Sequence, residues 1–296
     1  MPSLSGRTAI VTGANSGLGY ETARGLAAHG ATVIMACRSA ERGAAALAQI
    51  RSSVLNPDAS VRALDLADLS SVRSFAESYE GGLDVLVNNA GVMAIPRSET
   101  ADGFEMQFGT NHLGHFALTG LLLPALLTRP GARVVTVSSQ VANIGHIDFD
   151  NPQRQRHYSR WLAYAQAKLA NQLFCLQLDR RARASGSDLI SAAAHPGYAA
   201  TNLQSGSGGI SGRIMGLGNA LVAQSAAAGA LPTLYAASAA DVTGGTYYGP
   251  NGVGGTRGYP RRVRFVHAAK SEQTARHLWE VSEELTGVTY DALGVS

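Results

Sequence analysis

Short runs of β-branched and other apolar residues alternate along the chain with longer segments in which apolar positions recur at spacings of three and four. The short runs predict strands, and the longer segments predict helices. Regular alternation of the two is the pattern of βαβ units, which build a parallel sheet covered by helices on both faces. We therefore expect an α/β fold.

About seven strands follow from this pattern, which suits one doubly wound, Rossmann-type parallel sheet flanked by helices. The two longest helices are expected over about 102–127 and 158–184. No linker-like change of composition divides the chain, so residues 1–296 are expected to form a single domain. The expected strands are 8–11, 32–36, 61–64, 83–87, 133–137, 189–194 and 246–248.

Composition and charge exclude several classes of function. The 296 residues are 45% hydrophobic and 15% charged, so the chain can bury a large core. The formal charge is only +3 and the sequence contains no block of Lys and Arg residues, which argues against nucleic-acid binding. The N-terminus lacks a basic-then-apolar signal pattern, and the apolar stretch 118–127 is too short to span a bilayer. We expect a soluble cytoplasmic protein without an integral membrane segment.

Several residues that often carry chemistry are expected to be structural here. Cys37 and Cys175 form neither a disulfide framework nor a metal-spaced cluster, which fits a reducing compartment. Arg261, Arg262 and Arg264 alternate with apolar residues as on an edge strand, and their charges are expected to be solvated. No metal is expected, because the histidines are scattered without ligand spacing. These histidines are His112, His115, His146, His157 and His195.

The turn after the first expected strand is rich in glycine. Residues 12–19 read TGANSGLG, and Gly13, Gly17 and Gly19 remove side chains where the turn must tighten and a pyrophosphate must approach the backbone. The following helix then directs its N-terminus at the phosphates. The segment predicts a dinucleotide site that includes Asn15, Ser16 and Leu18.

The end of the second strand predicts which dinucleotide binds. An acid at this place would favour NAD by binding the adenosine ribose, but Cys37 stands there. Arg38 follows with a guanidinium that suits a 2′-phosphate, and Arg42 lies one helical turn further on. We therefore predict that NADP(H) is preferred over NAD(H).

Two further strand ends are expected at the same edge of the sheet. Asp65 and Leu66 follow the third strand, where the Asp65 carboxylate can accept a hydrogen bond from an adenine amino group. Residues 88–91 read NNAG after the fourth strand. Asn88 is expected to tie neighbouring strand ends through its amide, and the small residues there leave room for the ribose. Asn89, Ala90 and Gly91 complete this part of the predicted cofactor site.

A candidate catalytic group lies further along the chain. Tyr164 and Lys168 are four residues apart, which places them on one face of the expected helix 158–184. A neighbouring ammonium and a cationic nicotinamide both favour the phenolate, so Lys168 and a bound cofactor are expected to lower the pKa of Tyr164. Ser139, at the end of the fifth strand, can hydrogen-bond a substrate oxygen. Asn111 is expected to hold a water that links Lys168 to solvent.

Together these segments resemble the short-chain dehydrogenase/reductase family over nearly the whole chain. The resemblance rests on residues 12–19 and 88–91 with Asn111, Ser139, Tyr164 and Lys168. Residues 36–38 (ACR), 111–116 (NHLGHF), 168–171 (KLAN) and 195–197 (HPG) resemble the retinol-dehydrogenase and protochlorophyllide-reductase-like branch. The C-terminal segments 248–252 and 277–282 look like those of soluble bacterial members.

The resemblance implies further site residues and a substrate class. In such proteins Pro196 and Gly197 line the nicotinamide and Thr201 contacts its carboxamide. The branch generally prefers NADP and lipophilic substrates. Residues 203–218, rich in glycine but with apolar members, suit a mobile lid over an apolar site or a surface loop. The long helices form a homodimer or homotetramer interface in many relatives, yet apolar helix faces also cover a sheet within one chain.

These inferences predict an NADP(H)-dependent enzyme that interconverts a carbonyl, an aldehyde or ketone of lipophilic character, and the corresponding alcohol. Tyr164 is the predicted acid-base, Lys168 its tuner and a ribose ligand, and Ser139 the oxyanion donor. The alternative is a non-catalytic redox sensor that binds NADP(H). A sensor needs no proton donor, so the complete set of Asn111, Ser139, Tyr164 and Lys168 favours the enzyme.

Overall fold

The computed structural model describes residues 1–197 and 225–294, and within them eight strands form one sheet. The strand order is β3-β2-β1-β4-β5-β6-β7-β8, and every neighbouring pair is parallel except β7 and β8. The strands are β1 (Thr8–Thr12), β2 (Thr32–Cys37), β3 (Ala59–Ala63), β4 (Val85–Asn88), β5 (Arg133–Val137), β6 (Ile190–Ala194), β7 (Thr246–Pro250) and β8 (Pro260–Val263).

The predicted fold class is confirmed, but the described residues form eight strands where seven were predicted. The additional strand is β8, which pairs antiparallel with β7 at the sheet edge, with Arg262 opposite Tyr248. The arginines that alternate with Val263 and Phe265 were predicted to lie as on an edge strand, and β8 confirms this, although it was not among the seven predicted strands. The seven predicted strands all form, with ends shifted by at most two residues.

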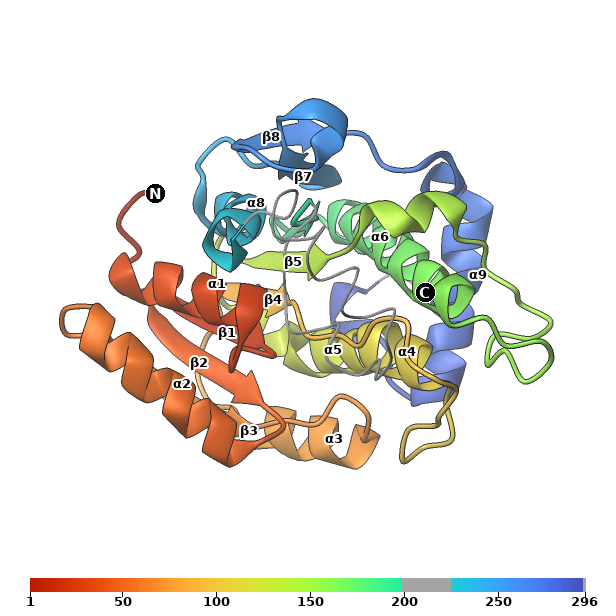
Figure 1. Ribbon diagram of the computed structural model, residues 1–296, viewed down its shortest axis with the longest axis horizontal. Coiled ribbons are helices and arrows are strands. Elements are labelled where there is room, and N and C mark those ends of the chain that lie inside the picture. Colours follow the sequence, from red (N-terminus) through yellow and green to blue (C-terminus); the bar gives the residue numbers. More distant parts are fainter. Residues whose placement is uncertain (198–224, 295–296) are drawn as a thin grey trace, which may run out of the picture.

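Helices cover both faces of the sheet (Figure 1). One buried cluster joins the sheet to α1, α2 and α8, and another joins the opposite face to α3, α5, α6 and α9. None of the helices in the described part of the chain is long and apolar enough to cross a membrane. The helix bounds are α1 (Gly17–Ala28), α2 (Ala40–Ser53), α3 (Leu69–Glu77), α4 (Met106–Phe108), α5 (Gly114–Leu127), α6 (Arg160–Ala184), α8 (Ala226–Ser238) and α9 (Glu272–Thr286).

The expected helix over 102–127 is interrupted. It begins at Met106, where the buried Glu105 carboxylate accepts hydrogen bonds from the backbone of Gln107 and Phe108. A π-helical turn, η1 (Gly109–Leu113), separates α4 from α5. The prediction of one continuous helix was therefore wrong at its first turn and in its middle, because apolar spacing does not show a π turn.

Helix α9 covers the outer side of α5 and α6. The Trp279 ring packs against Phe116 of α5 and Phe174 of α6, at centroid distances of 5.1 and 5.8 Å. Tyr290, beyond α9, donates a hydrogen bond from its hydroxyl to the Phe116 carbonyl at 2.7 Å. The apolar faces of these two helices are therefore buried by the chain's own C-terminal segment.

Candidate functional site

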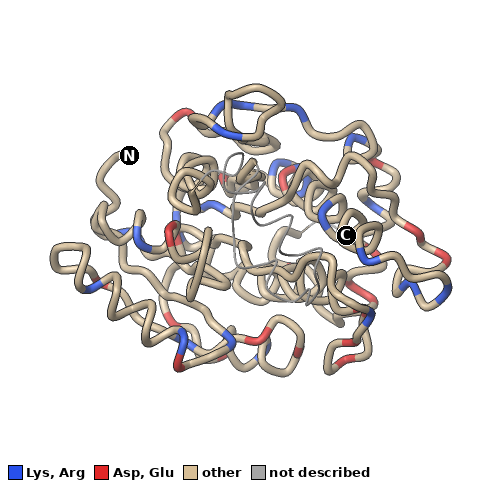
Figure 2. The backbone as a smooth tube through the Cα atoms, in the orientation of Figure 1, with Lys and Arg blue, Asp and Glu red and all other residues tan. Residues whose placement is uncertain are grey.

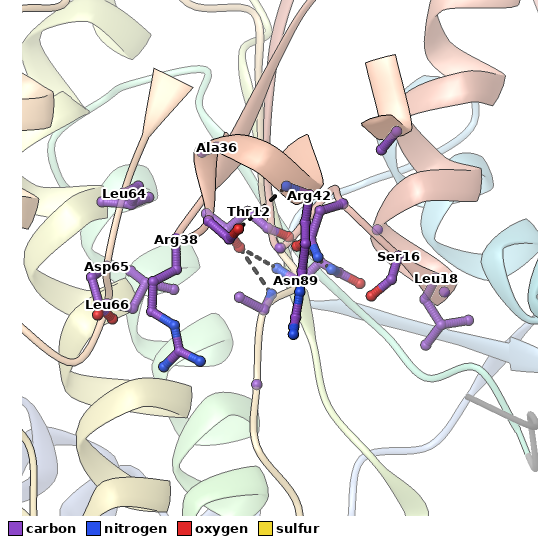
Figure 3. Close-up of a pocket in the computed structure, with 18 of the residues that line it drawn as sticks. Thr12, Ser16, Leu18, Ala36, Arg38, Arg42, Leu64, Asp65, Leu66 and Asn89 are labelled. Carbon is purple, nitrogen blue, oxygen red and sulfur yellow. Dashed lines mark hydrogen bonds between the residues drawn. The ribbon is translucent and has the colours of Figure 1, made fainter. Parts of the chain in front are cut away.

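A cleft of about 790 Å³ lies at the carboxyl ends of β1, β2, β3 and β4 (Figure 3). In open α/β sheets this edge is where ligands bind. The structure brings twelve of the predicted cofactor-binding residues together around it. They are Gly13, Asn15, Ser16, Gly17, Leu18, Gly19, Arg38, Asp65, Leu66, Asn89, Ala90 and Gly91.

The glycine-rich turn forms the floor of this cleft. Gly13 has a φ of +66°, which glycine adopts at no steric cost. A Cβ at Gly19 would lie 2.5 Å from Nδ2 of Asn89 and still closer to the Gly13 carbonyl, so only glycine fits. Ser16 begins α1 without a side-chain cap, and the first turn of α1 carries no acid. The open N–H groups and the positive end of the helix dipole therefore suit an anion such as a pyrophosphate.

The tie between the ends of β1 and β4 is made by Asn89. Its Nδ2 donates to the Thr12 carbonyl at 2.8 Å, while Oγ1 of Thr12 accepts from the backbone of Asn89 and Ala90. Asn88, expected to make this tie, instead donates to Thr119 of α5. The expectation failed because successive residues of a strand point to opposite faces of the sheet.

Two arginines border the cleft beside the end of β2 (Figure 3). Arg38 and Arg42 are exposed, and neither forms an ion pair with a residue in the described ranges. Cys37 is buried, and burial raises the pKa of its thiol to about 11, so no charge opposes the guanidinium groups there. Asp65 lines the same cleft and accepts a hydrogen bond from the Ala67 backbone through Oδ1.

The four predicted catalytic residues form one connected group beside the cleft. Tyr164 hydrogen-bonds Ser139, and Nζ of Lys168 lies 5.8 Å from the Tyr164 ring centroid. A Cβ at Gly91, which lines the cleft, would lie 3.6 Å from Nζ of Lys168 and 2.8 Å from Oδ1 of Asn111. The ammonium and the Asn111 side chain therefore meet at the cleft wall.

Hydrogen bonds hold these side chains in place. Nζ of Lys168 donates to the Val137 carbonyl at 3.1 Å. Oγ of Ser139 accepts from the Val141 backbone at 3.2 Å, which leaves its O–H available to donate. The Asn111 amide both donates to and accepts from the Val92 backbone. The predicted role for Asn111, holding a water, stays a prediction, and its side chain is engaged in positioning residue 92.

Burial dominates the electrostatics of the group. It raises the pKa of Tyr164 to about 12, although the Ser139 hydrogen bond lowers it in part. Burial also lowers the pKa of Lys168 to about 8. The expected lowering of the Tyr164 pKa by Lys168 is therefore wrong for the protein groups alone, because desolvation opposes both charged forms. At neutral pH the phenol is protonated.

His115 connects the two parts of the site. Its Nδ1 donates to the Asn111 carbonyl at 3.0 Å, and its Nε2 lies 2.9 Å from Oγ1 of Thr12. A carbonyl only accepts, so Nδ1 carries the proton and Nε2 accepts from the threonine. Burial lowers the pKa of His115 to about 4, so it is neutral. His115 was not among the predicted site residues, although its position four residues after Asn111 places both on one helical face.

The remaining predicted site residues lie elsewhere. Pro196 and Gly197 follow β6 and do not line the large cleft. Thr201 and the expected lid 203–218 lie outside the described residues. Beside the catalytic group, Trp161 is 42% exposed and packs edge-on toward Tyr164, with 6.4 Å between the ring centroids. Within 1–197 and 225–294 no three His, Cys, Asp or Glu residues group as metal ligands.

Comparison with known proteins places this geometry in a family. The model of the short chain dehydrogenase family matches residues 7–208. Human retinol dehydrogenase 12 is 41% identical over 293 residues, which cover 97% of this chain and 89% of the relative. Human retinol dehydrogenase 13 is 42% identical over 296 residues, covering 96% and 86%.

Solved structures agree with this assignment. An uncharacterized protein from Mycobacterium paratuberculosis is 47% identical, with a TM-score of 0.83 over 98% of this chain and 97% of that one. An NAD(P)-dependent gluconate 5-dehydrogenase from Beutenbergia cavernae, solved with bound NADP, is 25% identical, with a TM-score of 0.60 over 79% and 90%. Because the family match spans well over half of the sequence and the curated relatives align along nearly all of it, this chain belongs to the short-chain dehydrogenase family of oxidoreductases and is retinol-dehydrogenase-like.

Proposed function

We propose that this chain is an NADP(H)-dependent oxidoreductase that interconverts a lipophilic aldehyde or ketone and the corresponding alcohol. The observation that carries the proposal is the group of buried Tyr164 and Lys168 with half-buried Ser139, beside the 790 Å³ cleft whose wall Lys168 reaches at Gly91. A hydride moved onto a carbonyl carbon requires a proton for the oxygen, and a protonated phenol held beside a second hydroxyl supplies it.

The cleft fits a nicotinamide dinucleotide on three counts. The start of α1 has no side-chain cap and offers backbone N–H groups to the phosphates. Gly19 has no side chain, so the cofactor can approach the backbone closely. Arg38 and Arg42 are cations that form no ion pair with a described residue. Such a cofactor supplies the hydride when bound. Arg38 and Arg42 would hold a 2′-phosphate, and Lys168, reaching the wall at Gly91, would hold a ribose.

The residues of the chain then handle the proton. Tyr164 donates its phenolic proton to the substrate oxygen while Ser139 donates a hydrogen bond to the same atom. The Tyr164 phenolate left behind gains from the nearby Lys168 ammonium, because opposite charges attract strongly in a buried site. A pKa of about 12 keeps Tyr164 protonated at neutral pH, which favours the reduction direction.

The lipophilic substrate class is supported by exposed apolar groups near Tyr164. Trp161, whose ring lies 6.4 Å from that of Tyr164, and Leu162 at the start of α6 are 42% and 43% exposed. The relatives named retinol dehydrogenase are consistent with such a substrate. Cys37 and Cys175 are free and buried, which supports action in a reducing cytoplasm.

A homodimer or homotetramer stays a prediction. Helix α9 packs on α5 and α6 within the chain, with Trp279 between Phe116 and Tyr290. The part of these helices around Phe116 is therefore covered within the chain and is not available for self-association.

The test is oxidation of NADPH and NADH with a panel of lipophilic aldehydes and ketones, comparing the native protein with Tyr164→Phe and Arg38→Asp. We expect turnover that depends on Tyr164 and prefers NADPH, with the preference lost in Arg38→Asp. Tight NADPH binding without turnover on any carbonyl would instead favour the redox sensor.

A further inference from the structure

We propose that a second cleft, of about 360 Å³ beside β7 and β8, binds a small organic anion with an apolar body. Among the described residues the two clefts share no lining residue, so the proposal does not rest on the proposed function. The size of the second cleft lies at the lower end of the range for small-molecule sites. Cations on one side, an aromatic wall and a buried donor define its ligand.

The cationic side is formed by Arg261 and Arg264, which line the cleft from β8 and the residue after it. Both side chains are exposed, and neither has a side-chain hydrogen bond or ion pair with any residue in 1–197 or 225–294. No Asp or Glu lines the cleft, and residues 242–271 contain none. Figure 2 shows the basic positions of this hairpin at the sheet edge. The local field therefore favours an anion.

The aromatic wall explains why the ligand should carry an apolar group. Tyr247 and Phe265 stack at a centroid distance of 5.1 Å with an interplanar angle of 19°, and Val263 lies beside them in the cleft. Tyr247 is only 3% exposed, so half-buried Phe265 and Val263 offer the apolar surface, which a free inorganic anion would leave in contact with water. An aryl or alkyl carboxylate or phosphate would cover it and bring its charge to the two guanidinium groups.

His195 supplies a buried donor. It is 3% exposed and lines the cleft, and its Nδ1 accepts a hydrogen bond from the Gly197 backbone at 3.1 Å. The proton of the neutral ring is therefore on Nε2. In the part of the chain that the structure describes, Nε2 has no hydrogen-bond partner. Gly249 has no Cβ, and one there would collide with Nε2, so the ring fits only beside a glycine.

The neighbouring walls are fixed, so the cleft is built rather than incidental. Gln140 donates through Nε2 to the carbonyl oxygens of Gly254 and Gly255, at 2.7 and 3.3 Å. Gln172 accepts from the Val266 backbone at 3.1 Å. These bonds attach the loop after β7 and the loop after β8 to η2 (Gln140–Ile144) and α6.

The experiment is calorimetric titration of the full chain with phenyl phosphate, whose ring and dianion match the wall and the arginines. The key variant is the double substitution Arg261→Gln/Arg264→Gln. The matched control is Arg262→Gln, because Arg262 lies between them in sequence but does not line the cleft. We expect the double variant to lose at least about tenfold in affinity, since charge-assisted hydrogen bonds are the strong ones. Arg262→Gln should change affinity less than about threefold.

Two further measurements show where phenyl phosphate binds. Because Arg38 is itself proposed to hold a phosphate, the titration is repeated in Arg38→Gln, where any binding in the cofactor cleft is weakened. The loss of affinity caused by Arg261→Gln/Arg264→Gln should persist in that background, and its disappearance would overturn the proposal by showing that the anion binds in the cofactor cleft. The ring ¹⁵N resonances of His195, assigned with His195→Gln, should shift on titration. Equal losses in Arg262→Gln and the double variant, an unmoved His195 resonance, or no binding at millimolar probe would each refute the site.

Discussion

The cofactor-binding half and the catalytic half of the candidate site are built from different chemical groups. The cofactor cleft is formed by backbone turns, a helix terminus and exposed side chains such as Arg38 and Arg42. The catalytic half is formed by buried side chains, with the pKa of Tyr164 raised to about 12 and that of Lys168 lowered to about 8. A site made of backbone depends on small residues and chain geometry, whereas a site made of buried polar side chains depends on individual functional groups.

The largest effect should come from Tyr164→Phe, which removes the only atom proposed to donate the proton. We expect turnover to fall by about 10²- to 10⁴-fold. The affinity for NADPH should stay within about threefold, because the cofactor cleft gains its shape from other residues. Single-turnover kinetics and NADPH fluorescence titration measure the two quantities.

Tyr235→Phe is the matched control for this change. Its hydroxyl donates to Asp241 at 2.6 Å on the exposed side of α8, away from both clefts. This variant should retain native turnover. If Tyr164→Phe kept more than a tenth of the native rate, the division between a binding half and a catalytic half would be wrong.

Gly19→Ala should give the largest effect in the backbone half. The added Cβ would lie 2.5 Å from Nδ2 of Asn89, so the turn and the tie to β4 must shift. We expect a destabilisation of about 1 to 3 kcal/mol and a fall in NADPH affinity of at least about tenfold. Thermal unfolding and fluorescence titration measure these.

Gly103→Ala separates the loss of stability from the loss of NADPH affinity. Nothing lies within 4 Å of a Cβ at Gly103, but its φ of +82° makes an alanine strained. It should lower stability by about 1 kcal/mol without changing NADPH affinity. A similar loss of affinity in both variants would mean that Gly19→Ala acts only through stability.

The buried His115 makes the free energy of unfolding depend on pH. Burial lowers the pKa of His115 to about 4, so below its ordinary pKa of 6.5 the unfolded chain takes up a proton that the folded chain does not. Stability from the neutral ring is present above pH 6.5 and is lost as the pH falls toward 4. His115→Gln should reduce this loss by about 2 kcal/mol or more, measured by urea unfolding at pH 7 and pH 4.

The exposed His146 provides the control for this prediction. His146→Gln removes an exposed imidazole, and the pH dependence of unfolding in this variant is the baseline against which His115→Gln is compared. If His115→Gln and His146→Gln gave the same pH dependence, His115 would be charged in the folded protein and its bond to Thr12 would need another tautomer.

The sequence predicted the backbone half more completely than the side-chain half. Glycine spacing reports directly on turns, so the residues from Gly13 to Gly19 and from Asn89 to Gly91 were placed together correctly. Which asparagine ties the strands depends on which face each side chain occupies, and there Asn88 was chosen in place of Asn89. The direction of the Tyr164 pKa depends on how deeply the group is buried, which spacing along a helix does not show.

The eighth strand and the π turn were missed for similar reasons. β8 is short and begins with proline, so its sequence carries only a weak strand pattern. The π turn η1 arises where Gly109 and Gly114 pack without Cβ atoms against neighbours, including Thr100 and Leu66. Both features are decided by tertiary packing, which overrides local preference.

The smallest effect should come from Arg42→Gln in the cofactor half. Arg42 is exposed at the cleft rim, where solvent screens its charge and a long side chain loses entropy on binding a phosphate. We expect NADPH affinity to fall by only two- to fivefold, less than in Arg38→Gln, and the difference to shrink further at high salt. NADH affinity should not change.

Arg51→Gln, at the far end of α2, is the control with the same loss of charge. An effect of Arg42→Gln equal to that of Arg38→Gln would show that the two guanidinium groups contribute equally to phosphate binding, and the exposed half would then depend on individual groups as strictly as the buried half.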